Sequence, residues 1–375
     1  MVEIVRDFEP FFGFKQTGIP DIGALHYLQK LGVIDIGSNS VRMVVFDGAA
    51  RSPSYFYNEK ILCGLGLGLV NSGKLNPEGK LRAISAIERF VNIAEAMEVP
   101  QLTLIATAAV RSASDGLIFC DEIRKKTKKE VNIIDGLEEA RLSAQGVMLG
   151  WPGSYGLICD LGGSSMELAE INKGTVGKRT SSNLGPLILK EMKGGKKNRK
   201  QYIKLKIAEL AVKIGPQHNR LFLVGGSWRA FARIDMLRRG YPLHVMHEYR
   251  ISISSVKKTI KYIESNDLNE IRLKCGITAA RIGLVPIASA LTLHALEISH
   301  SRYRVQGWSQ AVGPGPSVSW FRFARGRSPI VDLSECLVAR MVRRPCGDRP
   351  SWPAQAANSR AKTRKAAFEW ETRET

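Results

Sequence analysis

Histidine and cysteine are scarce in this chain, with six residues of each among 375. No two cysteines have the Cys-x-x-Cys spacing, and no pair of histidines completes a set of zinc ligands. The composition therefore argues against the common zinc modules and against a disulfide-stapled scaffold. We expect reduced, mostly buried thiols at Cys63, Cys120, Cys159, Cys275, Cys336 and Cys346.

The sequence also lacks a long uninterrupted apolar segment. Its longest apolar stretch, Ile277–Ile298, contains Arg281, Pro286 and His294, whereas a helix that spans a bilayer needs about 20 mostly apolar residues. Residues 1–32 carry several charges and no apolar segment typical of a signal peptide. We therefore predict a buried helix over Ile277–Ile298, a soluble cytoplasmic protein and no membrane partner.

Acidic residues are fewer than basic ones, 35 against 55, so the formal net charge is +20. The positive electrostatic field of such a chain attracts polyanions of any kind, so the net charge does not identify the partner. The first 300 residues hold 23 Lys and 18 Arg, but residues 301–375 hold 2 Lys and 12 Arg with four of the six tryptophans. Residues 305–375 also show no sustained helical or strand period. From this composition we predict an irregular, disordered tail. It is either a natural basic tail or the product of a frameshifted or chimeric reading frame.

Strand and helix patterns alternate between about Gly32 and Arg304, which is typical of an α/β protein. Val33–Ser40 and Ile158–Ser165 share one plan, a buried strand that ends in Asp, one apolar residue and a Gly-led turn. Such a duplication indicates two similar domains that face each other. We predict an N-terminal extension at 1–31, a first domain at 32–152, a second at 153–304 and the tail at 305–375.

The same patterns locate the individual elements. A helix over Pro77–Met97, for example, follows from apolar Leu81, Ile84, Ile87 and Val91 at helical spacing. Further helices are expected around 115–126, from Leu137 onward and through 230–237. Strands are expected at 33–36, 41–46, 102–106, 131–134, 156–160, 166–171 and 221–224.

The two Gly-led turns have the chemistry of a phosphate site. A tight turn of Gly and Ser directs backbone N–H groups outward together, and such a nest binds phosphate oxygens. Asp35 and Asp160 end the strands before the turns, where they are placed to hold a hydrated Mg²⁺. A third Gly-rich turn, Gly225–Ser227, follows another apolar strand. One such turn often serves shape alone, but two in matching contexts are more specific.

The ordered set of motifs resembles the exopolyphosphatase/guanosine pentaphosphate phosphatase (Ppx/GppA) family of the actin-like ATPase superfamily. The resemblance covers roughly residues 32–300, and the joint order is far more specific than any single motif. It implies two actin-like, RNase H-like domains with the site in the cleft between them. The motifs are Asp35–Ser40, Ala106–Arg111, Asp135–Arg141, Asp160–Leu168 and Gly225–Ala230.

The resemblance also implies residue roles. Glu139 matches the catalytic glutamate that orients and deprotonates the attacking water, and Glu167 matches a second acidic position that assists with metal or water. Asp35 and Asp160 would hold Mg²⁺, with Mn²⁺ as an alternative, and Arg111 would pair with phosphate through its planar fork. The implied phosphate cradle consists of Gly37, Ser38, Asn39, Gly162, Gly163, Ser164, Ser165, Gly225 and Gly226.

Several of these residues have simpler interpretations. Glu138 and Glu139 would also suit the N-terminal turn of a helix, where acids face the macrodipole. We expect Arg141 to form a structural salt bridge and Trp228 to pack in the core. The chain departs from the family pattern in the second turn, where Ser164 and Met166 stand in place of a glycine and a threonine. It departs further at residues 300–308, which lack the family's closing glycine-rich segment.

The densest basic run of the core is a candidate track for a long polyanion. The solvated-surface interpretation is about equally supported by the sequence. The run comprises Lys193, Lys196, Lys197, Arg199 and Lys200, with Lys204 and Lys206 beyond.

We carry three hypotheses of function. The first is an exopolyphosphatase that removes terminal phosphate from inorganic polyphosphate, or the same hydrolysis of guanosine pentaphosphate, a substrate that would connect the protein to the stringent response. The second is an impaired remnant that binds polyanions or nucleotides, and the third is an actin-like sugar or acetate kinase, which we rank lowest. We expect no nucleic-acid partner, and a homodimer is left open.

Overall fold

The first domain is built on a five-stranded sheet. In the computed structural model, which describes residues 30–47, 55–151, 153–215, 220–243, 245–246, 249–299 and 320–323, its strand order is β3-β2-β1-β4-β5. Strands β1 and β2 form an antiparallel hairpin, whereas β1, β4 and β5 run parallel. The strands are β1 (Leu31–Ile36), β2 (Ser40–Phe46), β3 (Tyr55–Leu62), β4 (Gln101–Ala106) and β5 (Val131–Ile133).

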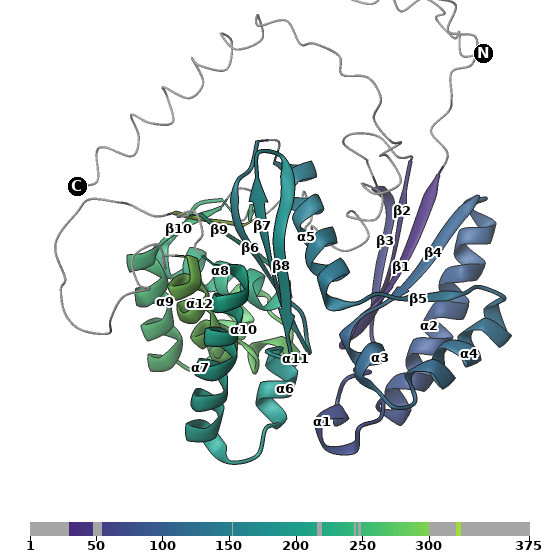
Figure 1. Cartoon of the computed structure of the whole chain (residues 1–375), viewed down its shortest axis with the longest axis horizontal. Coiled ribbons are helices and arrows are strands. Elements are labelled where there is room, and N and C mark those ends of the chain that lie inside the picture. Colours follow the sequence, from purple (N-terminus) through teal and green to yellow (C-terminus); the bar gives the residue numbers. More distant parts are fainter. Residues whose placement is uncertain are drawn as a thin grey trace, which may run out of the picture.

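The second domain repeats this plan. Its sheet has the order β10-β11-β9-β6-β7-β8, in which β6 pairs antiparallel with β7 and parallel with β9. The run β8-β7-β6-β9 therefore corresponds to β3-β2-β1-β4, and the predicted α/β duplication is confirmed (Figure 1). The strands are β6 (Gly156–Leu161), β7 (Met166–Asn172), β8 (Thr175–Ser182), β9 (Leu221–Val224), β10 (Arg250–Ser252) and β11 (Trp320–Phe323).

Helix α2 (Pro77–Ala96) covers one face of the first sheet, close to the predicted bounds. Its start is fixed by Asn76, whose side-chain oxygen accepts the N–H of Gly79 at 3.0 Å, and by Pro77 at the first helical position. Ile84, Ile87 and Val91 lie on its buried face. The other helices of this half are α1 (Leu69–Ser72), α3 (Ala108–Ser112), α4 (Gly116–Thr127) and α5 (Gly136–Gly150).

Helix α5 joins the two halves. Figure 1 shows it between the two sheets. Its residues Ala140, Ala144 and Val147 pack against Ile158 and Ile171 of the second sheet. By chain position α5 belongs to the predicted first domain, but this buried face belongs to the core of the second. The start of α5 is thereby held at the boundary between the domains.

The helices of the second domain enclose a large apolar core. The predicted single helix over Ile277–Ile298 is wrong, because this stretch forms two helices separated at Gly283–Leu284. Pro286 explains the break, since its missing N–H and fixed φ suit the first turn of a new helix and not a helix interior. The helices are α6 (Pro186–Glu191), α7 (Gly195–Ile214), α8 (Gly226–Arg239), α9 (Ile253–Ser265), α10 (Leu268–Cys275), α11 (Ala279–Ile282) and α12 (Val285–Ser299).

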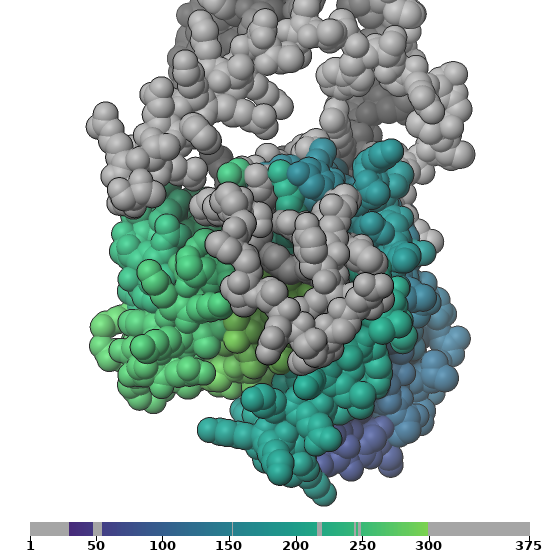
Figure 2. Space-filling view, turned by 60° about the vertical axis from the view of Figure 1, so that its left-hand side comes forward, coloured from purple at the N-terminus to yellow at the C-terminus, as the bar shows by residue number. Residues whose placement is uncertain are grey.

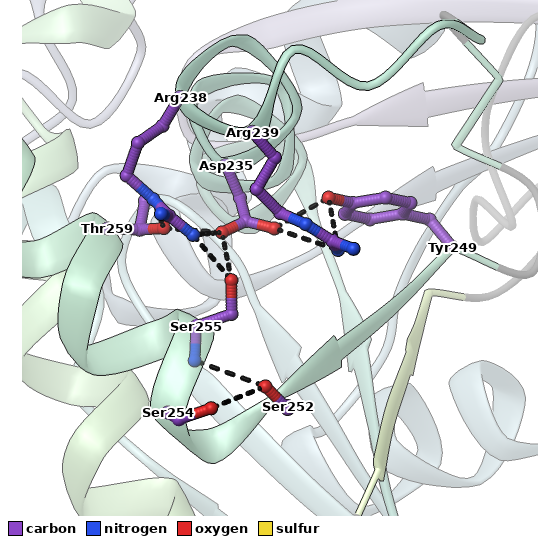
Figure 3. Close-up of polar contacts among 8 residues, drawn as sticks. All are labelled: Asp235, Arg238, Arg239, Tyr249, Ser252, Ser254, Ser255 and Thr259. Carbon is purple, nitrogen blue, oxygen red and sulfur yellow. Dashed lines mark hydrogen bonds and ion pairs between the residues drawn. The ribbon is translucent and has the colours of Figure 1, made fainter. Parts of the chain in front are cut away.

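A buried carboxylate anchors the C-terminal half of α8 (Figure 3). Asp235 is fully buried and accepts hydrogen bonds from the hydroxyls of Tyr249 at 2.6 Å and Ser255 at 2.8 Å. Arg238 donates to it at 2.9 Å, and Thr259 of α9 is a further donor. The network ties α8 to α9 and to the chain before β10.

Four residues of the predicted irregular tail form a short strand. Strand β11 lies between β9 and β10, parallel to β9, in the position that β5 occupies beside β4 in the first sheet. A strand this short is compatible with the absence of a sustained period. The remainder of 305–375 and the predicted extension 1–31, apart from Lys30 and Leu31, lie outside the described residues.

The burial that we predicted for the thiols is found at two of the four described cysteines. Cys63 and Cys159 are free and buried, and Cys120 and Cys275 are free and half-buried. Cys336 and Cys346 lie outside the described residues. Over the part of the chain that the structure describes, no helix is both long and apolar enough to cross a bilayer.

Candidate active site

The two hairpin turns have the same hydrogen bond and face each other. The N–H of Gly37 donates to the carbonyl of Ser40 at 3.0 Å, and the N–H of Gly162 donates to the carbonyl of Ser165 at 3.0 Å. A Cβ atom on Gly163 would lie 3.0 Å from Cβ of Ser38, so the second turn approaches the first at contact distance. Glycine at 163 allows this close approach.

A cleft of about 160 Å³ lies where the domains meet. It is lined by residues of both halves, so most of the residues predicted from separate motifs are brought together. The predicted residues in its lining are Asp35, Gly37, Ser38, Asn39, Glu139, Asp160, Gly162, Gly163, Ser165, Gly225 and Gly226.

The cleft presents backbone donors suited to an anion. Within the described residues, the N–H groups of Ser38, Asn39 and Gly163 donate to no backbone carbonyl. Gly226 and Ser227 begin α8 and line the same cleft. The first N–H groups of a helix have no intrahelical acceptor and carry the positive end of the helix dipole. Backbone donors arranged in this way are suited to phosphate oxygens.

Glu139 is a buried acid that contributes to the lining of the cleft. It lies in the first turn of α5, and the residue is only 6% exposed. Nη1 of Arg111 lies 3.3 Å from Oε2 of Glu139. Burial raises the pKa of Glu139 to about 7; Arg111 opposes the rise and the negative charge of Asp160 adds to it. A carboxylate with this pKa exchanges protons near neutral pH.

Two more carboxyl groups lie next to Glu139. Ser143, one turn further along α5, donates to Oδ2 of Asp160. Glu167 is directly opposite Asp160 in the β6–β7 hairpin and accepts a hydrogen bond from Ser181 at 2.8 Å. Burial, together with the charges of Glu139 and Asp160, raises the pKa of Glu167 well above its usual range. Glu139 and Asp160 thus place two acidic groups in the cleft lining, with the buried Glu167 beside Asp160.

Asp35 and Asp160 are the candidate ligands of a magnesium ion. They end equivalent strands and line the same cleft. No group of three or more His, Cys, Asp and Glu side chains in the described ranges has the arrangement of a metal site. Two carboxylates nevertheless fit Mg²⁺, which commonly takes one or two protein carboxylates and completes its shell with water and phosphate oxygens.

Three of the predicted catalytic and phosphate-binding residues do not line the cleft: Arg111, Ser164 and Glu167. Arg111 donates to the carbonyl of Ile134 at 2.6 Å and contacts Glu139, so its position suits the orientation of that acid. Its pairing with phosphate stays a prediction. Ser164 is buried, and no hydrogen-bond partner is recorded for its Oγ among the described residues.

The simpler interpretations of two other residues are confirmed. Arg141 makes a two-pronged ion pair with Glu138, at 2.7 and 2.6 Å. Trp228 is fully buried and donates from its ring nitrogen to Thr292 at 2.8 Å.

The basic run lies outside the cleft lining. It occupies the α6–α7 corner and the first turns of α7, and Figure 2 shows this corner projecting at the lower edge of the second domain. Its lysines are exposed. The four buried residues of α7, Ile203, Ile207, Leu210 and Ile214, begin further along the helix. The geometry suits a track outside the cleft and a solvated surface equally.

Three cationic residues of the cleft lining were not predicted: Lys60, Arg229 and Arg281. A Cβ on Gly226 would lie 1.5 Å from Nη1 of Arg281, so the guanidinium rests directly against the start of α8. Burial and the neighbouring charge of Arg233 lower the pKa of Arg281. No ion pair of Arg281 occurs among the described residues. In the sequence Arg281 stood out only as a charge within the apolar stretch Ile277–Ile298, and no local pattern predicted its contact with Gly226.

Comparison with known proteins identifies the family of the chain. A model of the Ppx/GppA phosphatase family matches residues 44–307. "Exopolyphosphatase 1" of Mycobacterium tuberculosis is 33% identical over 143 residues, which are 37% of this chain and 42% of that protein. The chain thus matches less than half the length of this curated relative.

Solved structures show the same architecture. An exopolyphosphatase from Cytophaga hutchinsonii superposes with a TM-score of 0.70 at 22% identity, over 84% of this chain and 98% of that one. A Ppx/GppA family member from Aquifex aeolicus gives 0.64 at 18% identity, over 84% and 97%. The fold is therefore that of a two-domain, actin-like protein with an interdomain cleft. The family match then identifies the chain as a member of the Ppx/GppA phosphatase family.

Proposed function

We propose that this protein is a hydrolase that removes the terminal phosphate from inorganic polyphosphate, with guanosine pentaphosphate as the alternative substrate of the same chemistry. The observation that carries the proposal is the position of Glu139, a buried acid with a pKa of about 7 at the edge of a cleft lined by two Gly-led turns. The name of the mycobacterial relative supports polyphosphate as the first substrate to test.

In the proposed reaction, a water molecule attacks the terminal phosphorus. A new P–O bond forms, the anhydride P–O bond breaks, and the shortened chain leaves with the electron pair of that bond. Glu139 takes the proton of the water, and Arg111 holds the carboxylate in place. The N–H groups of the turns and of the α8 N-terminus bind the equatorial oxygens, whose charge must be stabilised in a loose transition state.

A metal ion supplies charge neutralisation to a phosphoryl group when it is bound. Asp35 and Asp160 are the residues that would hold it. We expect activity to vanish in excess chelator and to return when Mg²⁺ or Mn²⁺ is restored. Orthophosphate release before and after chelation measures this, and full activity in chelator would contradict the metal assignment.

The basic run gives a prediction that depends on chain length. If Lys196, Lys197 and Lys200 track a polyanion, their combined replacement by Ala weakens binding of long-chain polyphosphate more than of tripolyphosphate. The difference should shrink in 1 M salt, where the Debye length falls to about 3 Å. Equal losses on both substrates would identify the run as a general surface field.

The proposed function is tested by release of orthophosphate from polyphosphate in the absence of any acceptor. Hydrolysis needs only water as the acceptor, whereas a kinase of similar fold transfers the phosphoryl group to a nucleotide or a sugar. Activity that appears only after addition of such an acceptor would replace the hydrolase proposal with the kinase hypothesis. Binding of polyphosphate without turnover would favour the binding remnant.

A further inference from the structure

A row of charged side chains crosses the first sheet beside the cleft. Strand pairing places Asp35 of β1 opposite Arg42 of β2, and Arg42 opposite Lys60 of β3. Residues paired in this way have their side chains on the same face of a sheet. The neighbouring residues Ile36 and Ile61 point to the other face, into the core with α2. The row therefore lies on the face turned away from α2.

The second sheet carries an equivalent row of different charge. Asp160 pairs with Glu167, and Glu167 pairs with Ser181. Both rows thus begin with an aspartate. The position of Glu167 in the second row is taken by Arg42 in the first, and the position of Ser181 is taken by Lys60. The second row therefore continues from its aspartate to another acid, whereas the first row continues from its aspartate to two cations.

Only the two ends of the first row reach the cleft lining. Asp35 and Lys60 line it, whereas Arg42 is 4% exposed and donates from Nε to Asn58 at 2.8 Å. Strand β3 is the edge of the sheet, two strands from Asp35. Adjacent strands are about 4.8 Å apart, so the backbone of Lys60 lies roughly 10 Å from that of Asp35. Its exposed side chain enters the cleft from the outer side.

The charge of the cleft explains why a cation is needed there. Asp35, Glu139 and Asp160 face a substrate that is itself highly negative, and like charges repel most strongly where water is excluded. Of the cations in the cleft lining, Lys60 is the one contributed by the first domain. An ammonium on a flexible stem with three donors suits phosphate oxygens without fixed geometry.

We infer that Lys60 is a substrate-binding residue that contacts the phosphates behind the terminal one. The inference rests on the proposed function. The terminal phosphate must lie against the turns and Glu139, so a cation that enters from the edge strand meets the remaining chain. Lys60 therefore favours substrates that have further phosphates behind the terminal one. The equivalent residue of the second domain, Ser181, is neutral and cannot supply this charge.

The test measures binding and turnover of Lys60→Met in the full chain. Affinity for tripolyphosphate, measured by calorimetry, should fall about tenfold, the effect of one lost charge-assisted hydrogen bond. Affinity for orthophosphate should stay within about twofold of wild type, because orthophosphate has no further phosphate to contact. In kinetics, KM for tripolyphosphate should rise by the same factor with a smaller change in kcat.

Lys125→Met provides the matched control, because Lys125 is an exposed lysine of the same domain on α4. It should bind both ligands like wild type, and Lys60→Arg should recover most of the tripolyphosphate affinity. Equal tripolyphosphate affinity in the Lys60 and Lys125 variants would overturn the inference, as would an equal loss for orthophosphate and tripolyphosphate. If wild type binds tripolyphosphate but never hydrolyses it, the proposed function fails while the binding result still decides the role of Lys60.

Discussion

Glu139→Gln is expected to lower the turnover of polyphosphate by about 10²- to 10⁴-fold, the usual contribution of a general base. Glutamine keeps the size of the side chain and an oxygen that accepts from Arg111, but it cannot take a proton from water. Substrate affinity should be largely kept, so the loss should appear in kcat. Steady-state release of orthophosphate measures it, and near-normal turnover would contradict the assignment of the base.

Glu138→Gln is the matched control for this variant. Glu138 precedes Glu139 in the same helical turn, but it pairs with Arg141 and does not line the cleft. Its replacement should leave turnover close to wild type. A large loss in this control would mean that the acidic start of α5 matters through the helix and not through proton transfer.

The pH dependence of turnover follows from the raised pKa of Glu139, about 7. A base must be deprotonated, so kcat/KM should rise about tenfold per pH unit below pH 7 and level off above it. This limb should disappear in Glu139→Gln. A bound metal ion near Asp160 would oppose the rise in pKa and shift the limb to lower pH.

Asp235→Ala is expected to destabilise the fold by about 3 to 5 kcal/mol, because it removes the acceptor shared by several buried donors. A protein of this kind has a total stability of roughly 5 to 15 kcal/mol, so the variant should be close to unfolding. The hydroxyls of Tyr249, Ser255 and Thr259 would lose their common partner (Figure 3). The midpoint of denaturant unfolding measures the effect.

Asp121→Ala is the control for the Asp235 variant. Asp121 also pairs with an arginine three residues away, Arg124, but it is largely exposed on α4. Surface pairs of this kind contribute about 0 to 1 kcal/mol, so its loss should barely move the midpoint. A similar shift in both variants would contradict the stabilising role of the buried network.

The contribution of Asp235 also depends on pH. Burial alone would raise its pKa, but hydrogen bonds from Thr259, Tyr249, Arg238 and Ser255 outweigh burial and lower it. A lowered folded pKa stabilises the protein above the unfolded value of about 3.9, and this stabilisation is lost as the pH falls through the folded pKa. Wild type should therefore lose stability in acid below about pH 4 more steeply than Asp235→Asn.

The local patterns of the sequence predicted the two hairpins and their turns, because each depends on residues that are close in the chain. Glu139 was predicted from the family resemblance and not from a local pattern. The edge strand β3 was missed for a physical reason. Its core-facing side carries Glu59, which forms an ion pair with Arg89 of α2 and hides the apolar alternation of the strand. Because β3 was not predicted, the sequence alone could not show that Asp35, Arg42 and Lys60 lie side by side on one face of the sheet.

Other features depend on contacts between distant segments. The contact of Arg281 with Gly226 joins residues more than 50 positions apart, and no local rule predicts it. The same holds for β11, whose place in the second sheet is set by pairing with β9 and β10. The break between α11 and α12 was the opposite case, since Pro286 was visible in the sequence and its effect was underestimated.

The most direct measurement of the proposed hydrolysis is the fate of heavy-oxygen water during incubation of the full chain with Mg²⁺ and tripolyphosphate, without any acceptor. We predict that orthophosphate accumulates with one heavy oxygen per molecule, and that Glu139→Gln, measured in parallel, forms it at least about 10²-fold more slowly. Absence of labelled orthophosphate from wild-type incubations, or its formation at equal rates by both proteins, would contradict water attack directed by Glu139.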